Sequence, residues 1–333
     1  MNRERGACFS LPSRAPDRVS RRSLLLTGAV LMSGAPASVF GADEKAAPAK
    51  LKVAIFSKHL RFLEGVRLAD AAAEIGFDGI DLAVRQGGHV EPERVRQDLA
   101  PLVAIIRARG LEVPMLTTDI VDAETPHAAD ILGAMAELGV PYYRWGGLRY
   151  AAGQPIARQL ADMRPRVARL AEWNARFHAC AMYHTHSGID LVGASIWDLH
   201  ELLEGFDPNA VGVNYDVGHA TVEGGVGGWI NSLRITGRYL KGVAIKDFRW
   251  EKGEHGDWQP RWTPLGEGMV HFPQFFREIS ALGFSGPLQL HFEYPLGGAE
   301  AGRTQITIDR EQVLEAMKRD LQRLRSYMKD AGL

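Results

Sequence analysis

Cysteine is almost absent from this chain of 333 residues, which contains only Cys8 and Cys180. The chain also lacks any run of roughly 20 uninterrupted apolar residues, the length that a membrane-spanning helix requires. An excess of charge of one sign is missing too, because 39 basic residues stand against 40 acidic ones. Nucleic-acid binding usually depends on a basic face. We therefore expect a globular protein with no membrane span and no nucleic-acid partner.

The first 42 residues resemble an export signal. They contain six arginines, at positions 3, 5, 14, 18, 21 and 22, against two acidic residues. The pair Arg21-Arg22 precedes an apolar stretch that ends near Phe40, an arrangement typical of twin-arginine signals. An ordinary secretory signal or an uncleaved anchor remains an alternative.

Small residues favour cleavage of this segment after Ala37 or after Gly41. Residues 1–42 carry a net charge of +4 and the whole chain −1, which leaves a mature chain of about −5 and argues further against a polyanionic partner. Only Cys180 then remains, so no internal disulfide can form even in an oxidising compartment. These features predict a periplasmic or otherwise extracytoplasmic protein.

Beyond a short linker at residues 43–50, short β-branched or aromatic runs alternate with longer amphipathic segments. The runs that predict strands begin near Leu51, Asp78, Leu111, Val140, His178, Ala210, Tyr239 and Pro287. The amphipathic periodicity predicts helices over 60–75, 92–109, 127–138, 156–177, 195–204, 229–237, 272–282 and 308–329. Glycines that suit C-terminal caps follow four of these helices, at Gly76, Gly110, Gly139 and Gly283.

This alternation predicts a single-domain (β/α)8 TIM barrel over residues 51–333. A doubly wound sheet is the alternative, but no Gly-x-Gly-x-x-Gly motif follows the first predicted strand. In TIM barrels the functional side chains lie at the C-terminal ends of the strands. Polar residues at those positions are therefore the candidates for a functional site.

Histidines and an aspartate end the fifth and sixth predicted strands. His184 and His186 are two residues apart, so both side chains project to the same side of an extended strand. One can be a ligand or base and the other a packing residue, and for His186 both roles stay open. Asp216 ends an apolar strand, where burial of an unpaired carboxylate is costly, so we expect a cation or a metal beside it. Capping of a following helix is the less favoured interpretation, because a glycine-rich stretch intervenes after His219.

Lys246 ends the seventh predicted strand, on the same face as Gly242 and Ala244. Its ammonium can polarise a substrate carbonyl, pair with a carboxylate or act as a base, or it can form only a structural salt bridge to Asp216 or Glu293.

In the eighth predicted strand, Gln289, His291 and Glu293 alternate with apolar residues. Because burial of this polar set against the helices would be costly, we expect it to face the barrel interior. Glu293 is the best single candidate for a catalytic carboxylate.

Other polar residues near the strand ends are weaker candidates, because arginine and lysine are commonly solvated. They are Lys58, His59, Asp81, Arg85, His89, Thr118, Asp119, Arg144 and Trp145. The segment from Arg249 to Val270 contains three tryptophans that can form either aromatic platforms for a sugar or a packed lid: Trp250, Trp258 and Trp262.

Short segments in chain order resemble the xylose-isomerase-like sugar phosphate isomerase/epimerase barrels, which include inosose dehydratases and ketose 3-epimerases. The matching segments are Gly76-Phe77-Asp78-Gly79-Ile80-Asp81, Tyr183-His184-Thr185-His186, Asp216-Val217-Gly218-His219-Ala220, Lys246-Asp247, Pro264-Leu265-Gly266-Glu267-Gly268 and Glu293.

The resemblance implies a divalent metal (Mn²⁺, Mg²⁺, Co²⁺ or Zn²⁺) with ligands His184, Asp216 and Glu293. The family normally has a further histidine on the seventh strand, and Ala244 stands at that position here. One ligand is therefore missing or replaced: histidines at 186, 219 or 291 can substitute, or Lys246 supplies the positive charge without a metal.

Together these features predict a sugar or keto-sugar isomerase or epimerase that removes a proton next to a carbonyl. The expected catalytic residues are Glu293, Lys246 and His186. The expected substrate-binding residues are His219, Arg144, Asp81, Lys58, His291 and Trp262. The partner is a small sugar or glycoside, and the sequence leaves open whether the chain forms a homo-oligomer.

Three alternatives remain. A dehydratase or lyase acting on an inosose or a 3-keto-glycoside uses the same enolate chemistry. A catalytically silent sugar-binding barrel is motivated by Ala244. A metal-dependent endonuclease shares the fold, but the negative charge of the mature chain disfavours it.

Overall fold

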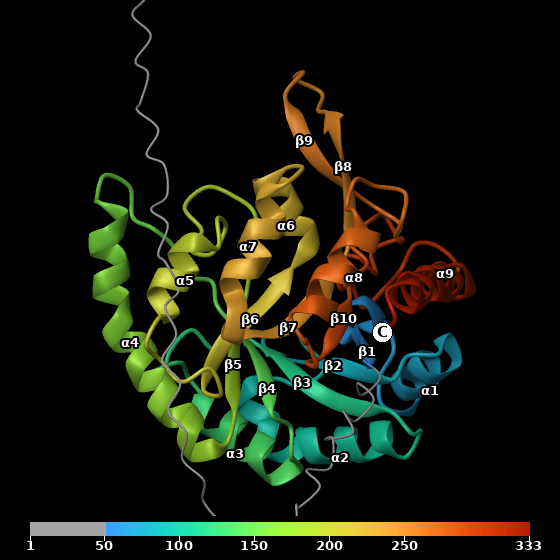
Figure 1. Cartoon of the computed structure of the whole chain (residues 1–333). Helices are drawn as coiled ribbons and strands as arrows, with labels where there is room; N and C mark the ends of the chain where they lie inside the picture. Colours follow the sequence, from blue (N-terminus) through green and yellow to red (C-terminus); the bar gives the residue numbers. More distant parts are fainter. Residues whose placement is uncertain (1–50) are drawn as a thin grey trace, which may run out of the picture. The chain divides into compact units, whose positions relative to one another are not determined.

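Parallel strands close into a barrel in the computed structural model, which describes residues 51–333; the expected signal and linker lie outside these residues. The strands neighbour one another in the order β1-β10-β7-β6-β5-β4-β3-β2, which confirms the predicted TIM barrel (Figure 1). The barrel strands are β1 (Val53–Phe56), β2 (Gly79–Val84), β3 (Glu112–Thr118), β4 (Tyr142–Trp145), β5 (Cys180–His184), β6 (Val211–Asp216), β7 (Leu240–Ile245) and β10 (Leu288–Leu290).

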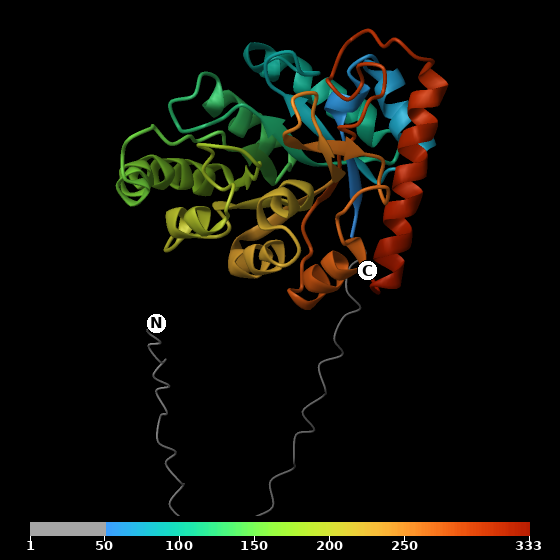
Figure 2. The same cartoon turned by 90° about the horizontal axis from the view of Figure 1, so that it is seen from above.

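Helices surround this barrel, as Figure 1 shows. They are α1 (Val66–Ile75), α2 (Val95–Arg107), α3 (Ala128–Leu138), α4 (Ile156–Phe177), α5 (Trp197–Leu203), α6 (Val217–Gly224), α7 (Gly228–Thr236), α8 (Phe272–Ala281) and α9 (Arg310–Asp330), with short 3-10 helices η1 (Ser57–Leu60), η2 (Pro92–Arg94) and η3 (Gly237–Tyr239). The long helix α9, red in Figure 2, packs against α1 and so closes the ring of helices. None of the described helices is long and apolar enough to span a membrane.

Strand β4 shows how alternation separates the helical layer from the barrel interior. Tyr143 donates a hydrogen bond to Asn174 of α4, and Trp145 packs edge-on against Tyr183, so both side chains point outward. Tyr142 and Arg144, at the alternate positions, therefore point inward. Tyr142 accordingly packs against the small inner cluster of Met115, Cys180 and Met182. The interior is thus apolar at its lower end and polar at its mouth.

Two elements were not expected from the sequence. Helix α6 begins directly after Asp216, whose side chain accepts a hydrogen bond from the backbone N–H of His219. The expectation that the glycine-rich stretch would prevent capping is therefore wrong, because the glycines lie at the end of α6 and not at its start. The segment after Lys246 forms an antiparallel hairpin of β8 (Asp247–Lys252) and β9 (Trp258–Thr263), which projects from the barrel in Figure 1.

A carboxylate ties the base of this hairpin to the barrel. Asp247 accepts hydrogen bonds from the backbone N–H groups of Gly266 and Gly268 at one oxygen and of Phe248 and Val270 at the other, at 2.9–3.1 Å. The residue is 2% exposed. The segment that follows the hairpin is thereby fixed next to the end of β7.

Candidate active site at the barrel mouth

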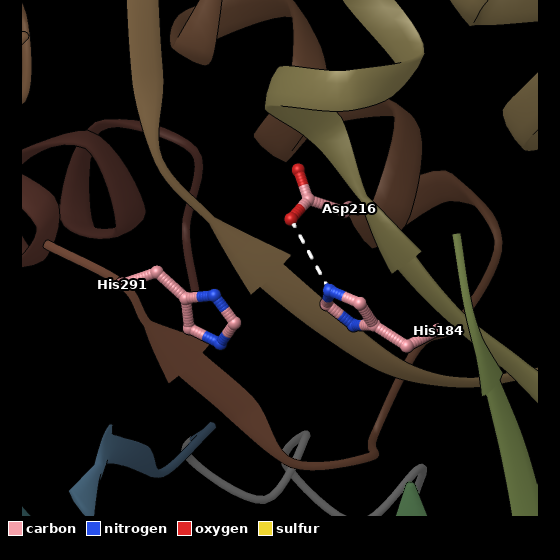
Figure 3. A group of neighbouring side chains, drawn as sticks. All are labelled: His184, Asp216 and His291. Atoms are coloured by element: carbon pink, nitrogen blue, oxygen red, sulfur yellow. Dashed lines mark ion pairs between the residues drawn. The ribbon is translucent and has the colours of Figure 1, made fainter. Parts of the chain in front are cut away.

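Three buried side chains from different strands meet at the C-terminal end of the barrel. His184 ends β5, Asp216 ends β6, and His291 directly follows β10. One potential ligand atom from each lies within 4.8 Å of the other two. Figure 3 shows the imidazole of His184 directed at the carboxylate of Asp216, with 3.6 Å between Nε2 and Oδ2.

This group has the donor set of a divalent metal site. His291 Nε2 is fully buried and forms no hydrogen bond with any part of residues 51–333, whereas the buried Asp216 Oδ2 has the Lys246 ammonium as a close partner, at 3.0 Å. Buried polar atoms rarely lack a partner, and a metal ion is one way to satisfy them. Two imidazoles and one carboxylate suit zinc and other first-row divalent ions. The residues present therefore fit a metal.

A buried amide beneath the group orients His184. Asn214 Nδ2 lies 3.1 Å from His184 Nδ1 and 2.7 Å from Gln289 Oε1. Because the amide engages Nδ1, Nε2 is the nitrogen that faces Asp216. Outer contacts of this kind hold ligating histidines in position in metal sites.

The ammonium of Lys246 is the positive partner of Asp216. Its Nζ lies 3.0 Å from Asp216 Oδ2 and 2.8 Å from His219 Nε2, and 4.5 Å from the centre of the Trp262 ring. Ser187 Oγ contacts the other ring nitrogen of His219 at 2.7 Å. Lys246 is 5% exposed, so its ammonium is largely shielded from solvent by these three neighbours. The cation that the sequence predicts beside Asp216 is present.

Burial sets the protonation states at this site. It raises the pKa of Asp216, and the Lys246 ammonium opposes that rise. It lowers the pKa of His184 and of His291 well below the usual range, and nearby cations add to the effect. It also lowers the pKa of His186 to about 3. The imidazoles are therefore neutral near pH 7, and each keeps a lone pair that can bind a metal or accept a proton.

Glu293 lies outside the three-residue group, although the resemblance implies it as a ligand. Its carboxylate pairs with Lys58 at 3.0 and 3.1 Å, and its Oε1 is 4.0 Å from His291 Nδ1. His291 takes a place among the candidate ligands instead. Burial acts to raise the pKa of Glu293, but nearby His59, Lys246 and Lys58 outweigh it and lower the pKa to about 2.

A ligand can reach this carboxylate from outside. The side chain of Glu293 is 23% exposed. It lines a cavity of about 330 Å³ between the hairpin and the chain that follows β10, together with Trp262, Arg261 and Glu300. Glu293 is thus an ionised, accessible carboxylate beside a buried histidine.

Asp81 and Thr117 form a second polar pair at the mouth. Thr117 Oγ1 lies 2.9 Å from both carboxylate oxygens of Asp81, which is 1% exposed. Burial raises the pKa of Asp81 to about 7, against smaller lowering effects of Thr117 and of two arginines.

The pKa of Asp81 has a measurable consequence for stability. In an unfolded chain an aspartate ionises near pH 3.9, whereas folded Asp81 keeps its proton to about pH 7. Ionisation therefore favours unfolding, and stability is lost as pH rises from about 4 to 7. Between pH 4 and pH 7, the free energy of unfolding of Asp81→Asn should therefore rise by on the order of 4 kcal/mol relative to that of the parent protein. Above pH 7 we expect no further increase in this difference.

Urea unfolding of both proteins at pH 5, 6, 7 and 8 measures this difference. Asp162→Asn, at an exposed position on α4, is the matched control and should run parallel to the parent protein. If the free energies of unfolding of Asp81→Asn and of the parent protein changed with pH in parallel, Asp81 would have an ordinary pKa in the folded protein.

The structure brings most of the expected residues to one mouth. The expected residues at the ends of the fifth, sixth, seventh and eighth barrel strands contact one another. Six further expected residues surround them: Lys58, Asp81, Arg144, His186, His219 and Trp262. His186 lies between His184 and His219, with ring centres 4.6 and 5.0 Å away.

Sequence reasoning did not single out Asn214, Thr117 or Ser187. Asn214 stands two residues before Asp216, so the alternation that places Asp216 inside also places Asn214 inside. The contacts of Thr117 and Ser187 depend on which strands and helices become neighbours, which no local pattern shows.

Comparison with known proteins agrees with this geometry. The family model described as xylose isomerase-like TIM barrel matches residues 69–327. The chain belongs to the xylose isomerase-like TIM barrel family. None of the curated proteins matches the chain.

Solved structures of the same fold resemble this xylose isomerase-like barrel only distantly in sequence. A xylose isomerase domain protein from Alicyclobacillus acidocaldarius is 18% identical, with a TM-score of 0.64 over 85% of this chain and 100% of that one. D-psicose 3-epimerase from Clostridium cellulolyticum is 13% identical (TM-score 0.58, 84% and 99%). 3-Keto-D-glucoside 4-epimerase from E. coli is 15% identical (TM-score 0.58, 83% and 100%).

Within the xylose isomerase-like barrel, the seventh strand contributes no ligand in this chain. Ala244 is fully buried and lies in register with Asp216 on one side and Gln289 on the other. Its methyl group cannot coordinate an ion. The candidate metal group therefore takes its second imidazole from His291, after β10.

Proposed function

We propose that the chain is a sugar or keto-sugar isomerase or epimerase that removes a proton from the carbon next to a carbonyl. The observation that supports this is the meeting of an ionised carboxylate, neutral imidazoles and an ammonium at one barrel mouth. Epimerases are among the solved structures with this fold. An enolate forms in such a reaction, and positive charge near its oxygen stabilises it.

In this proposal Glu293 accepts the substrate proton. It is ionised near pH 7, and it lines the cavity beside the hairpin. Lys246 stands near the developing negative charge as a fixed ammonium, and His186 is a neutral imidazole that can hydrogen-bond a substrate oxygen. Trp262 covers Lys246 and excludes water from it.

A divalent metal held by His184, Asp216 and His291 would supply additional positive charge for a substrate oxygen. Lys246 lies 3.0 Å from one of the candidate ligand atoms, so the protein's own cation shares the carboxylate of Asp216.

A catalytically silent sugar-binding barrel is the second candidate, and the observation that favours it is Ala244 at the family's histidine position. A lyase or dehydratase that passes through the same enolate differs only in what leaves afterward. Exchange of substrate protons with solvent separates the enzyme from the silent barrel, because only the enzyme forms the enolate.

The decisive experiment incubates the protein in D₂O with a panel of ketoses and keto-glycosides, before and after loading with Mn²⁺, Co²⁺ or Zn²⁺. We expect deuterium at the carbon next to the carbonyl of at least one compound, and about one metal ion per chain by elemental analysis. Tight binding without exchange in any compound would favour the silent barrel.

We also propose that residues 1–42 direct export, and that the substrate is consequently a free sugar or glycoside outside the cytoplasm. The support is the Arg21-Arg22 pair before the apolar stretch. Replacement of both arginines by lysine should retain the protein in the cytoplasmic fraction, and unchanged export would refute the twin-arginine route.

A further inference from the structure

Two arginines at the barrel mouth form no ion pair within residues 51–333. Arg144 lies on β4, and Arg85 directly follows β2. Within residues 51–333 neither guanidinium forms a hydrogen bond or an ion pair with another side chain or with the backbone. Both residues are partly buried, and no nitrogen of either is among the fully buried atoms without a partner. A ligand from the mouth can therefore reach both.

Arg144 points into the barrel and not toward the helices. The adjacent residues Tyr143 and Trp145 are bound in the outer layer, which leaves the inner side for Arg144. In register beside Arg144 are Thr117 on β3 and Met182 on β5, and both of these face the interior. The guanidinium is thus directed at the space above the inner apolar cluster.

Arg85 reaches the same space from the opposite side of β3. Its guanidinium carbon lies 5.4 Å from the centre of the Phe56 ring, and that ring lies 5.0 Å from His291. The two arginines repel each other, and burial and this repulsion lower the pKa of Arg144. Asp81 lies near both arginines, but burial raises its pKa to about 7, so it offsets their positive charge only in part.

The carboxylates at the mouth are already engaged elsewhere. Asp216 pairs with Lys246, Glu293 pairs with Lys58, and Asp81 is hydrogen-bonded to Thr117. Asp119, also near Arg144, is exposed to solvent. Asp216 and Glu293 thus have cationic partners of their own, burial keeps Asp81 protonated up to about pH 7, and the two guanidinium groups remain for an anion from outside.

We propose that Arg144 and Arg85 form a subsite for a carboxylate of the substrate, so that the chain acts on an acidic sugar. A guanidinium binds a carboxylate through two parallel hydrogen bonds, and the planar group suits a narrow interior. A phosphate carries more negative charge than a carboxylate, so the nearby Asp216 carboxylate would repel it more strongly, and we consider it disfavoured for that reason. The carboxylate would lie at the β2–β4 side of the mouth, with the reacting carbon toward β10.

This inference rests on the proposed function for its geometry, since the reacting end is placed at Glu293. It predicts binding, whereas the proposed function predicts exchange, so the two can fail separately. An acidic sugar that binds without exchange would support the subsite and count against the proton transfer. If a neutral ketose exchanged its proton as fast as the corresponding acidic sugar, the proton transfer would be supported and the carboxylate subsite would not.

The test compares matched pairs by isothermal titration calorimetry: D-fructuronate with D-fructose, D-tagaturonate with D-tagatose, and D-fructose 6-phosphate as the phosphate arm. We expect the full-length protein to bind at least one of the acids about 10- to 100-fold more tightly than its neutral partner, the usual effect of hydrogen bonds to a charged group. Arg144→Gln should remove most of this preference, with less than about threefold change for the neutral sugar.

Arg85→Gln should lower the preference by a smaller factor, because Arg85 lies beyond the end of β2, whereas Arg144 lies within β4. Arg158→Gln, at an exposed position on α4, is the matched control and should bind like the parent protein. Circular dichroism confirms that each variant folds. Equal affinity for acid and neutral sugar, tighter binding of the phosphate, no binding of either acid, or an equal loss for both members of a pair in Arg144→Gln would each overturn the proposal.

Discussion

Glu293→Gln should lose at least two orders of magnitude in the rate of solvent exchange into the substrate, while substrate affinity changes little. The amide has nearly the same shape as the carboxylate but cannot accept the proton, and general-base effects are typically about 10²- to 10⁴-fold. Glutamine can still contact Lys58, which lies 3.0 Å from the carboxylate in the parent protein. The exchange rate is measured by NMR in D₂O at saturating substrate.

The control for this experiment is Glu254→Gln, an exposed residue at the tip of the β8–β9 hairpin. It should exchange at the parental rate. If Glu293→Gln also retained the parental rate, the base would have to be another group, and the neutral imidazole of His186 is then the next to replace. A loss of affinity equal to the loss of rate would show that Glu293 binds the substrate and does not transfer its proton.

Asp216→Asn should weaken divalent metal binding by at least about 100-fold, because loss of a direct ligand costs no less than loss of an outer contact. It should also destabilise the metal-free protein by about 3 kcal/mol, since the buried ammonium of Lys246 loses its counter-charge. Metal affinity is measured by competition with a chelating dye, and stability by urea unfolding in the presence of EDTA.

Asp309→Asn, on the exposed residue before α9, is the matched control and should change neither quantity. Unchanged metal affinity in Asp216→Asn would exclude Asp216 as a ligand. Unchanged unfolding would show that His219, 2.8 Å from the ammonium, is a sufficient partner for Lys246.

The fold could be predicted from the sequence because its signals are local. Each barrel strand begins within a few residues of its predicted start, and every predicted helix is present with similar bounds. Gly76, Gly110, Gly139 and Gly283 all adopt the left-handed conformation expected of helix ends. Helix α6 could not be predicted in this way, because it is short and its own glycines weaken the helical pattern.

The site could be predicted only in part, because alternation tells which side of a strand a residue faces but not its height along the barrel. His291 and Glu293 share a face, as expected, yet only His291 reaches the level of His184 and Asp216. That level depends on the stagger between neighbouring strands, a property of the closed barrel. The pairing of Glu293 with Lys58, 235 positions away in the chain, depends on the same long-range geometry.

The position of Asp247 has a final consequence for how the ammonium works. Asp247 follows Lys246 directly, and its two oxygens hold four backbone N–H groups. The peptide that carries the ammonium is therefore anchored on both sides before any substrate arrives. Folding itself supplies the free energy needed to orient this charge, so the cost does not recur in each turnover. This is what effective preorganisation requires.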